Sequence, residues 1–279
     1  MIGSFTSKFF MLGQVLPAHR AAYSQYGGLF QPTMTQAIRL LSAQPFSKSS
    51  QASPPAPYPP LTTLPPYDLV DPFTNASLFY STNHFDLVHS PSAYLSRRHA
   101  WVHIFPEGKI HQHEDKIMRY FKWGVSRLIL ESEPAPTFVP VYIEGMDQVY
   151  HESREFPRPL PRPGKELAVT FGNAIETDQG IFGEMRRRWQ DIVSREQAND
   201  PEAGRHMGVL TENLKYSEEA RELRMECTMK VRDEIIKLRR SRGLPDEDPK
   251  NSLVATWRAE GGTGQREGQM ADGSWVKDT

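Results

Sequence analysis

The chain has a single cysteine, Cys227, among 279 residues. One cysteine excludes an internal disulfide and a cluster of thiolate metal ligands, and the flanks of Cys227 are typical of the inner face of a helix, so we interpret it as a core thiol. No run reaches the roughly 18 apolar residues that a membrane-spanning helix needs, so any membrane contact is expected to be peripheral. The formal net charge of −1 gives no general attraction to nucleic acid, which we do not expect as a partner.

Proline is abundant, and it is unevenly placed. Residues 44–72 hold nine of the 23 prolines, mixed with Ser, Ala and Thr. This composition cannot bury enough apolar surface to offset the entropy of ordering, so we expect an irregular insertion over about 44–99. A Pro-rich stretch can also recruit a partner domain, but a plain loop is the favoured interpretation.

The rest of the chain alternates between predicted strands and helices, which favours an α/β fold with a mixed sheet flanked by helices. We expect a C-terminal helical extension, because apolar residues recur at helical spacing over 210–242 until Gly243-Leu-Pro245 ends the pattern. The tail beyond Asp246 is expected to be loosely ordered. The predicted elements are strands 101–105, 137–143 and 167–172 and helices 119–132 and 210–242.

The stretch Trp101-Val-His-Ile-Phe-Pro-Glu-Gly-Lys109 carries the clearest functional signal. A short apolar strand leads into a turn, because Pro106 cannot donate to a sheet and Gly108 can adopt positive φ. Glu107 is therefore presented at the end of a strand, where open α/β sheets bind ligands. The alternative is an ordinary turn with a solvated Glu.

A second signal lies in the predicted helix 119–132. Phe121, Val125, Leu128 and Ile129 share one face, whereas Trp123 falls among Arg119 and Arg127 on the other. An aromatic ring beside cations suits the interface of an anionic membrane, so Arg119, Trp123 and Arg127 are candidate membrane contacts. The alternative is a helix that protein covers on both sides. Arg158, Arg162 and Lys165 are further candidates for lipid phosphates.

Several segments resemble, in order and spacing, the tafazzin family of phospholipid–lysophospholipid transacylases within the glycerolipid acyltransferase superfamily. They are residues 7–20, 27–31, 105–108, 119–125 and 139–147, and the tail segments 243–249 and 272–278 are similar to those of fungal members. The resemblance implies transfer of an acyl chain from a phospholipid to a lysophospholipid, with remodelling of cardiolipin and other phospholipids at mitochondrial membranes. It implies no metal and no soluble cofactor.

The resemblance also assigns roles to particular residues. Arg20 would bind the head-group phosphate, and Phe105, Pro106, Glu107 and Gly108 would form the acceptor site, with Glu107 orienting its polar groups. Val139 and Pro140 would form a wall of the lipid cleft. The family's general base is a His-x-x-x-x-Asp motif, in which Asp holds the imidazole so that a lysolipid hydroxyl can attack an ester carbonyl.

This base motif is absent. None of the nine histidines has Asp five positions later, and the nearest similarity, Asn83-His-Phe-Asp86, has the wrong spacing. No catalytic residue is therefore assigned. We expect Met1 to begin a shortened form that lacks the first strand and helix of the domain. Residues 1–178 would then form a truncated acyltransferase domain, and residues 179–279 the C-terminal helices and tail.

Without its base, the chain is expected to have little activity alone. Two other interpretations remain open: a CoA-dependent lysophospholipid acyltransferase, and a non-catalytic fragment that binds membranes. The composition does not distinguish them.

Overall fold

The computed structural model describes most of the chain after residue 100 and shorter parts before it. The described residues are 15, 16, 18, 28–42, 79–80, 88–89, 100–108, 112, 116–151, 160–201, 203 and 207–259. Arg20, His84, Asp86 and Arg158 lie outside these ranges, as does most of the Pro-rich insertion. Within the insertion, β1 (Phe79–Tyr80) and β2 (Val88–His89) form a short antiparallel pair.

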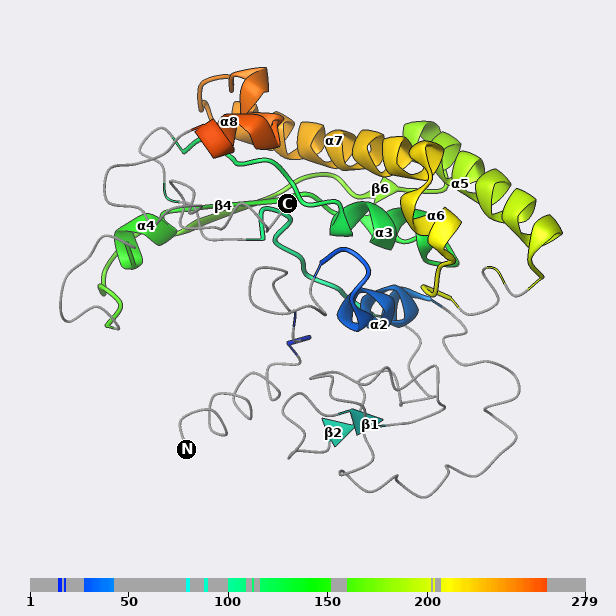
Figure 1. The fold of residues 1–279 in the computed structure, drawn as a ribbon. Coiled ribbons are helices and arrows are strands. Elements are labelled where there is room, and N and C mark those ends of the chain that lie inside the picture. The colour runs from blue at the N-terminus through cyan, green and yellow to red at the C-terminus, as the bar shows by residue number, and fades with distance from the viewer. Residues whose placement is uncertain are drawn as a thin grey trace.

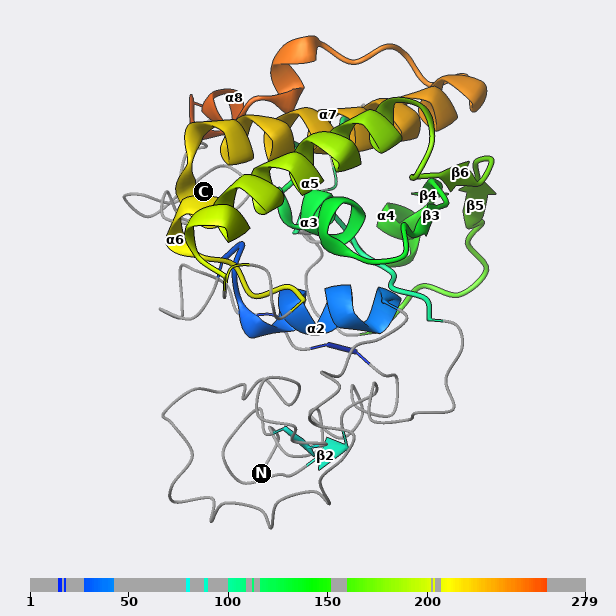
Figure 2. The same ribbon diagram turned by 90° about the vertical axis from the view of Figure 1, so that its right-hand side faces the viewer.

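Helix α3 (Gly124–Glu131) lies at the centre of the described fold. It is packed between α2 (Pro32–Leu41) on one side and the helices α5 (Gly180–Asn199) and α7 (Glu218–Ser241) on the other (Figures 1 and 2). Every residue from Val125 to Leu130 is buried. Protein therefore covers both sides of this helix, which is the alternative that the sequence left open.

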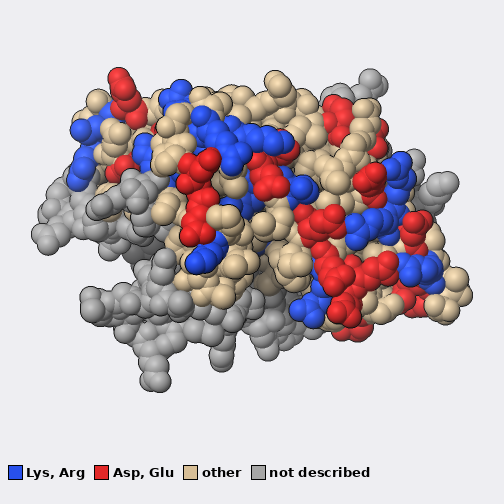
Figure 3. Space-filling model, turned by 90° about the horizontal axis from the view of Figure 1, so that it is seen from above, with Lys and Arg blue, Asp and Glu red and all other residues tan. Residues whose placement is uncertain are grey.

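The main core joins α3, α5 and α7. Its buried members on these three helices are Val125, Ile129, Leu130, Phe182, Met185, Trp189, Ile192, Ala220, Leu223, Cys227 and Val231. Cys227 is fully buried, which confirms the prediction of a core thiol. Charged side chains lie over this core, and positive and negative groups are interspersed on the face that Figure 3 shows.

Four short strands form a narrow antiparallel ribbon beside the helices. β4 (Val141–Glu144) pairs with β5 (Ala168–Phe171), and β3 (Thr137–Phe138) pairs with β6 (Ile175–Glu176). Pro140 has no N–H to donate, and it separates β3 from β4 within the predicted strand 137–143. Its carbonyl accepts a hydrogen bond of 2.8 Å from the Gly172 amide. The combination of helices and strands is confirmed, but the strand pairs within the described ranges are all two-stranded and antiparallel, so no mixed sheet is seen there.

The predicted helix 210–242 is divided at Ser217 into α6 (Glu212–Tyr216) and α7. Across the division, the buried Arg224 guanidinium of α7 donates to the carbonyls of Leu214 and Lys215 at the end of α6, at 2.6 and 3.0 Å. α7 ends as predicted: Gly243 has a φ of +76° and donates to the Arg240 carbonyl.

The remaining short helices are α4 (Met146–Val149), a 3-10 turn at Pro249–Ser252 and α8 (Val254–Ala259). The last two lie within the segment that was predicted to be loosely ordered, and Trp257 is buried at 4% exposure. That prediction is therefore wrong for residues 247–257. None of the helices in the described ranges is long and apolar enough to cross a bilayer.

Candidate functional site

Residues Phe105 to Gly108 form a tight turn, as predicted. The Gly108 amide donates to the Phe105 carbonyl at 2.9 Å, and Gly108 has a φ of +65°. A Cβ at this position would lie 3.1 Å from both Cδ and Cε of Lys122. The Lys122 amide in turn donates to the Pro106 carbonyl at 2.7 Å, so the turn is fixed against the segment that leads into α3.

Residues 101–105 lead into the turn, but they do not form the predicted strand. Residues 101–105 pair with none of the strands that the structure describes. Their exposure still alternates, because Val102 and Ile104 pack against the core while Trp101 and Phe105 are 97% and 66% exposed. The His103 ring lies 4.6 Å from the Phe105 ring. An exposed aromatic edge therefore borders the turn.

The Glu107 carboxyl group points away from solvent and toward the backbone of the next segment. Its Oε2 accepts a hydrogen bond of 2.9 Å from the Arg119 amide. Burial raises the pKa of Glu107 to about 7, against the lowering effects of this hydrogen bond and of the Arg119 charge. The alternative interpretation, an ordinary turn with a solvated Glu, is therefore wrong. Near neutral pH both protonation states are populated, so the group can accept or donate a proton in a hydrogen bond.

Val139 and Pro140 lie at the interruption between β3 and β4. Val139 is 44% exposed, whereas Pro140 is buried and would be 3.2 Å from a Cβ placed on Gly172. Hydrogen bonds and ion pairs within the described residues do not join either of them to Glu107. The connection is indirect, since Phe138 and Ile104 pack against the same core cluster.

Two of the three expected membrane contacts are inside the protein. Arg119 and Arg127 are each 1% exposed. Arg127 makes two hydrogen bonds of 2.7 Å to Glu131, and the Arg119 guanidinium lies 5.3 Å from the Trp257 ring. Their side chains cannot reach a bilayer, so this expectation is wrong for both.

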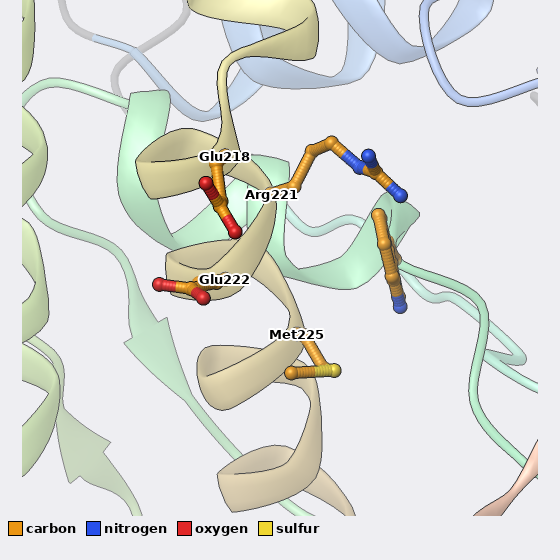
Figure 4. Close-up of a pocket in the computed structure, with 5 residues that line it drawn as sticks. Glu218, Arg221, Glu222 and Met225 are labelled. Atoms are coloured by element: carbon orange, nitrogen blue, oxygen red, sulfur yellow. The ribbon is translucent and has the colours of Figure 1, made fainter.

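Trp123 is the third expected contact, and it is partly exposed at the start of α3. It borders a shallow groove of about 220 Å³ together with residues of α7. In Figure 4, Arg221 and Met225 project to one side of α7, and Glu218 and Glu222 to the other. The charged groups therefore do not converge on one ligand position.

A buried polar cluster beside Glu107 was missed from the sequence. Arg232 and Arg239 of α7 pair with Glu247, and all three side chains are at most 3% exposed. A hydrogen bond from Arg239 lowers the pKa of Tyr142, but burial outweighs it and raises that pKa overall. From the sequence, the arginines are the basic end of an amphipathic helix and Glu247 belongs to a charged tail. The two arginines also donate to the carbonyls of Met118 and Lys116, which are more than 100 residues away and leave no local signal.

Comparisons with known proteins give relatives with two different names, tafazzin and N-acylphosphatidylethanolamine synthase. The chain is 31% identical over 263 residues to tafazzin of Saccharomyces cerevisiae, covering 91% of this chain and 59% of that protein. It is 29% identical over 116 residues to tafazzin of Drosophila melanogaster, covering 41% of this chain and 29% of that protein. An Arabidopsis thaliana protein named N-acylphosphatidylethanolamine synthase is 32% identical over 134 residues, covering 42% of this chain and 47% of that protein.

The chain thus spans about three fifths of the yeast protein's length and less of the others. No protein-family model matches it.

Proposed function

Because the chain is related in sequence to the tafazzins, we propose that it serves the transfer of acyl chains between phospholipids without CoA, with cardiolipin among the substrates. The observation that carries this proposal is the Phe105–Gly108 turn, which holds a largely buried carboxyl group beside an exposed aromatic edge. A carboxyl group whose pKa is about 7 can hydrogen-bond to the glycerol hydroxyl of a lysophospholipid in either protonation state. The aromatic edge offers apolar surface to its acyl chain.

In the reaction, the hydroxyl oxygen of the lysophospholipid forms a bond to the carbonyl carbon of the donor ester. The bond from that carbon to the donor's own glycerol oxygen breaks, and this oxygen gains the proton that the acceptor hydroxyl loses. A general base speeds such a step by ~10²–10⁴-fold. No histidine of residues 1–279 has the required Asp five positions later, so we propose that this chain alone binds the acceptor but transfers slowly.

We further propose that the chain lies on membranes, mitochondrial ones by resemblance, through the outer face of β4 and β5. Leu167, Val169 and Phe171 are 51%, 51% and 68% exposed. Val169 and Phe171 pair with Ile143 and Val141, whose side chains lie on the same face of the ribbon because directly paired residues share a face.

Cations lie beside this apolar face. Arg162 and Lys165 are exposed in the loop that leads into β5. Each cation near an anionic membrane surface adds ~1 kcal/mol, and burial of one large apolar side chain adds ~1.5–3 kcal/mol. This face therefore fits the membrane role better than Arg119 and Arg127 do.

A non-catalytic, lipid-binding role is the second candidate, and the missing His-x-x-x-x-Asp motif favours it. Both candidates require an acceptor site. A binding experiment with radiolabelled lysophospholipid and residues 1–279 tests that requirement. We expect saturable binding that Phe105→Ala weakens and that acyl-CoA does not displace. Displacement by acyl-CoA would favour the CoA-dependent alternative, and absence of saturable binding would refute the acceptor site.

A further inference from the structure

Glu247 follows α7 in the chain, and its carboxylate is only 2% exposed. Oε1 accepts a hydrogen bond of 2.6 Å from the Met118 amide and lies 2.9 Å from a guanidinium nitrogen of Arg239. Oε2 is paired with the Arg232 guanidinium. One carboxylate thus joins two arginines of α7 to the backbone of a segment that is more than 100 residues earlier in the chain.

The same two arginines also bind that segment directly. Arg232 donates to the carbonyls of Met118 and Arg119, at 3.1 and 3.3 Å, and Arg239 donates to the Lys116 carbonyl at 3.0 Å. Lys116 has a φ of +53°, a conformation that costs a residue with a side chain ~1–2 kcal/mol. The backbone at Lys116 is therefore held in a conformation that this residue does not favour by itself.

This segment and the residues that follow it, up to Lys122, supply two hydrogen bonds to the candidate site. The Arg119 amide donates to Glu107, and the Lys122 amide donates to the Pro106 carbonyl. We propose that Glu247 is a positioning residue for Glu107: by holding residues 116–119, it places the Arg119 amide where it orients the Glu107 carboxyl group. This inference rests on the proposed function, because it assigns a second residue to the same acceptor site.

The charges explain why a carboxylate is needed at this position. Removing one partner of a buried ion pair leaves the other charge uncompensated, and here two guanidinium groups would remain. Without Glu247, Arg232 and Arg239 would have to turn toward water and release the carbonyls of residues 116–119. Glu107 would then lose the fixed partner for its Oε2.

Amide hydrogen exchange tests the proposal on the chain itself, without lipid. In Glu247→Gln, we expect the amides of Arg119 and Lys122 to exchange at least ~10-fold faster than in the parent, while those of α5 change by less than ~2-fold. The matched control is Asp246→Asn at the neighbouring position, since Asp246 pairs with Arg240 at the surface, with 71% of its side chain exposed. It should leave both amides unchanged.

A second measurement separates positioning from general support of the fold. Two effects of Glu247→Gln on the pKa of Glu107 oppose each other: loss of the Glu247 charge lowers it, and loss of the Arg119 hydrogen bond, the larger effect, raises it. The Glu107 titration, followed by carboxyl ¹³C NMR, should therefore move to higher pH in Glu247→Gln. Glu247→Asp keeps the charge, so any move of its Glu107 titration to higher pH reports the weakened Arg119 hydrogen bond alone. It should still speed exchange at Arg119, because the shorter side chain cannot reach all three donors.

The outcomes are distinct. Unchanged exchange at Arg119 and Lys122 in Glu247→Gln, or an equal rise throughout α5, would overturn the proposal. If Glu247→Gln does not fold, the same comparison between Glu247→Asp and Asp246→Asn decides. Faster exchange at Arg119 and Lys122 in Glu247→Gln, in a protein that binds no lysophospholipid, would support the positioning role of Glu247 and refute only the proposed function.

Discussion

The titration of Glu107 makes the stability of the protein depend on pH in a direction that is unusual for a carboxyl group. Burial raises the pKa of Glu107 from its ordinary value of 4.5 to about 7. In this pH range the folded protein therefore binds more protons than the unfolded chain, so the stability falls as pH rises from about 4.5 to about 7 and stays lower above that range.

The magnitude follows from the pKa difference. At 1.36 kcal/mol per pKa unit, the rise from 4.5 to about 7 corresponds to about 3 kcal/mol of unfolding free energy lost between pH 4.5 and pH 8. Glu107→Gln has nearly the same shape, and its amide oxygen can still accept the Arg119 hydrogen bond. It cannot ionise, so it should match the parent near pH 4.5 and be more stable by about 2–3 kcal/mol at pH 8.

Urea unfolding of the parent and of Glu107→Gln, measured between pH 4.5 and 8, checks this expectation. Subtracting the two curves removes the contributions of all other groups. Glu222→Gln, on the exposed surface of α7, is the control and should differ from the parent by a constant amount. A stability difference for Glu107→Gln that is flat across this pH range would refute the raised pKa, and with it the buried carboxyl group at the candidate site.

Three further results are expected. Burial raises the pKa of the Cys227 thiol to about 12, so iodoacetamide should modify it at pH 8 only after urea unfolding, and rapid modification of the folded chain would contradict its place in the core. Arg127→Met should lower the unfolding free energy by ~3–5 kcal/mol, because it leaves the Glu131 carboxylate buried without its partner. The control Arg188→Met, at an exposed ion pair, should lower it by at most ~1 kcal/mol, and similar losses in the two variants would contradict this account. Phe171→Asp should weaken flotation with cardiolipin-containing vesicles by at least ~10-fold, and equal flotation of parent and variant would exclude the β4–β5 face.

Local patterns predict the parts of this fold that local interactions determine. The apolar spacing around Cys227 predicts the buried face of α7, and Gly243 predicts its end. The tight turn at Phe105–Gly108 follows from its proline and glycine. These features depend on helical periodicity and on backbone conformations that only a few residue types adopt.

Buried charges explain most of what the sequence misses. Arg127 is in the interior because Glu131 and the distant carbonyls of Leu29 and Gly208 accept its hydrogen bonds. A helical wheel places any arginine on a polar face, since it contains no information on partners that are remote in the chain. The same limit hides Glu247, whose hydrogen-bond donor Met118 is 129 positions away.

Acyl transfer in vesicles tests the central claim most directly. Residues 1–279 are compared with a chimaera in which a segment carrying a His-x-x-x-x-Asp motif is fused before Met1, and with the Glu107→Gln form of that chimaera. We expect the chimaera to transfer radiolabelled acyl chains from phospholipid to lysophospholipid at least ~100-fold faster than residues 1–279, and Glu107→Gln to remove most of the gain. The account would be contradicted if residues 1–279 alone transferred acyl chains as fast as the chimaera, or if Glu107→Gln left the transfer rate of the chimaera unchanged.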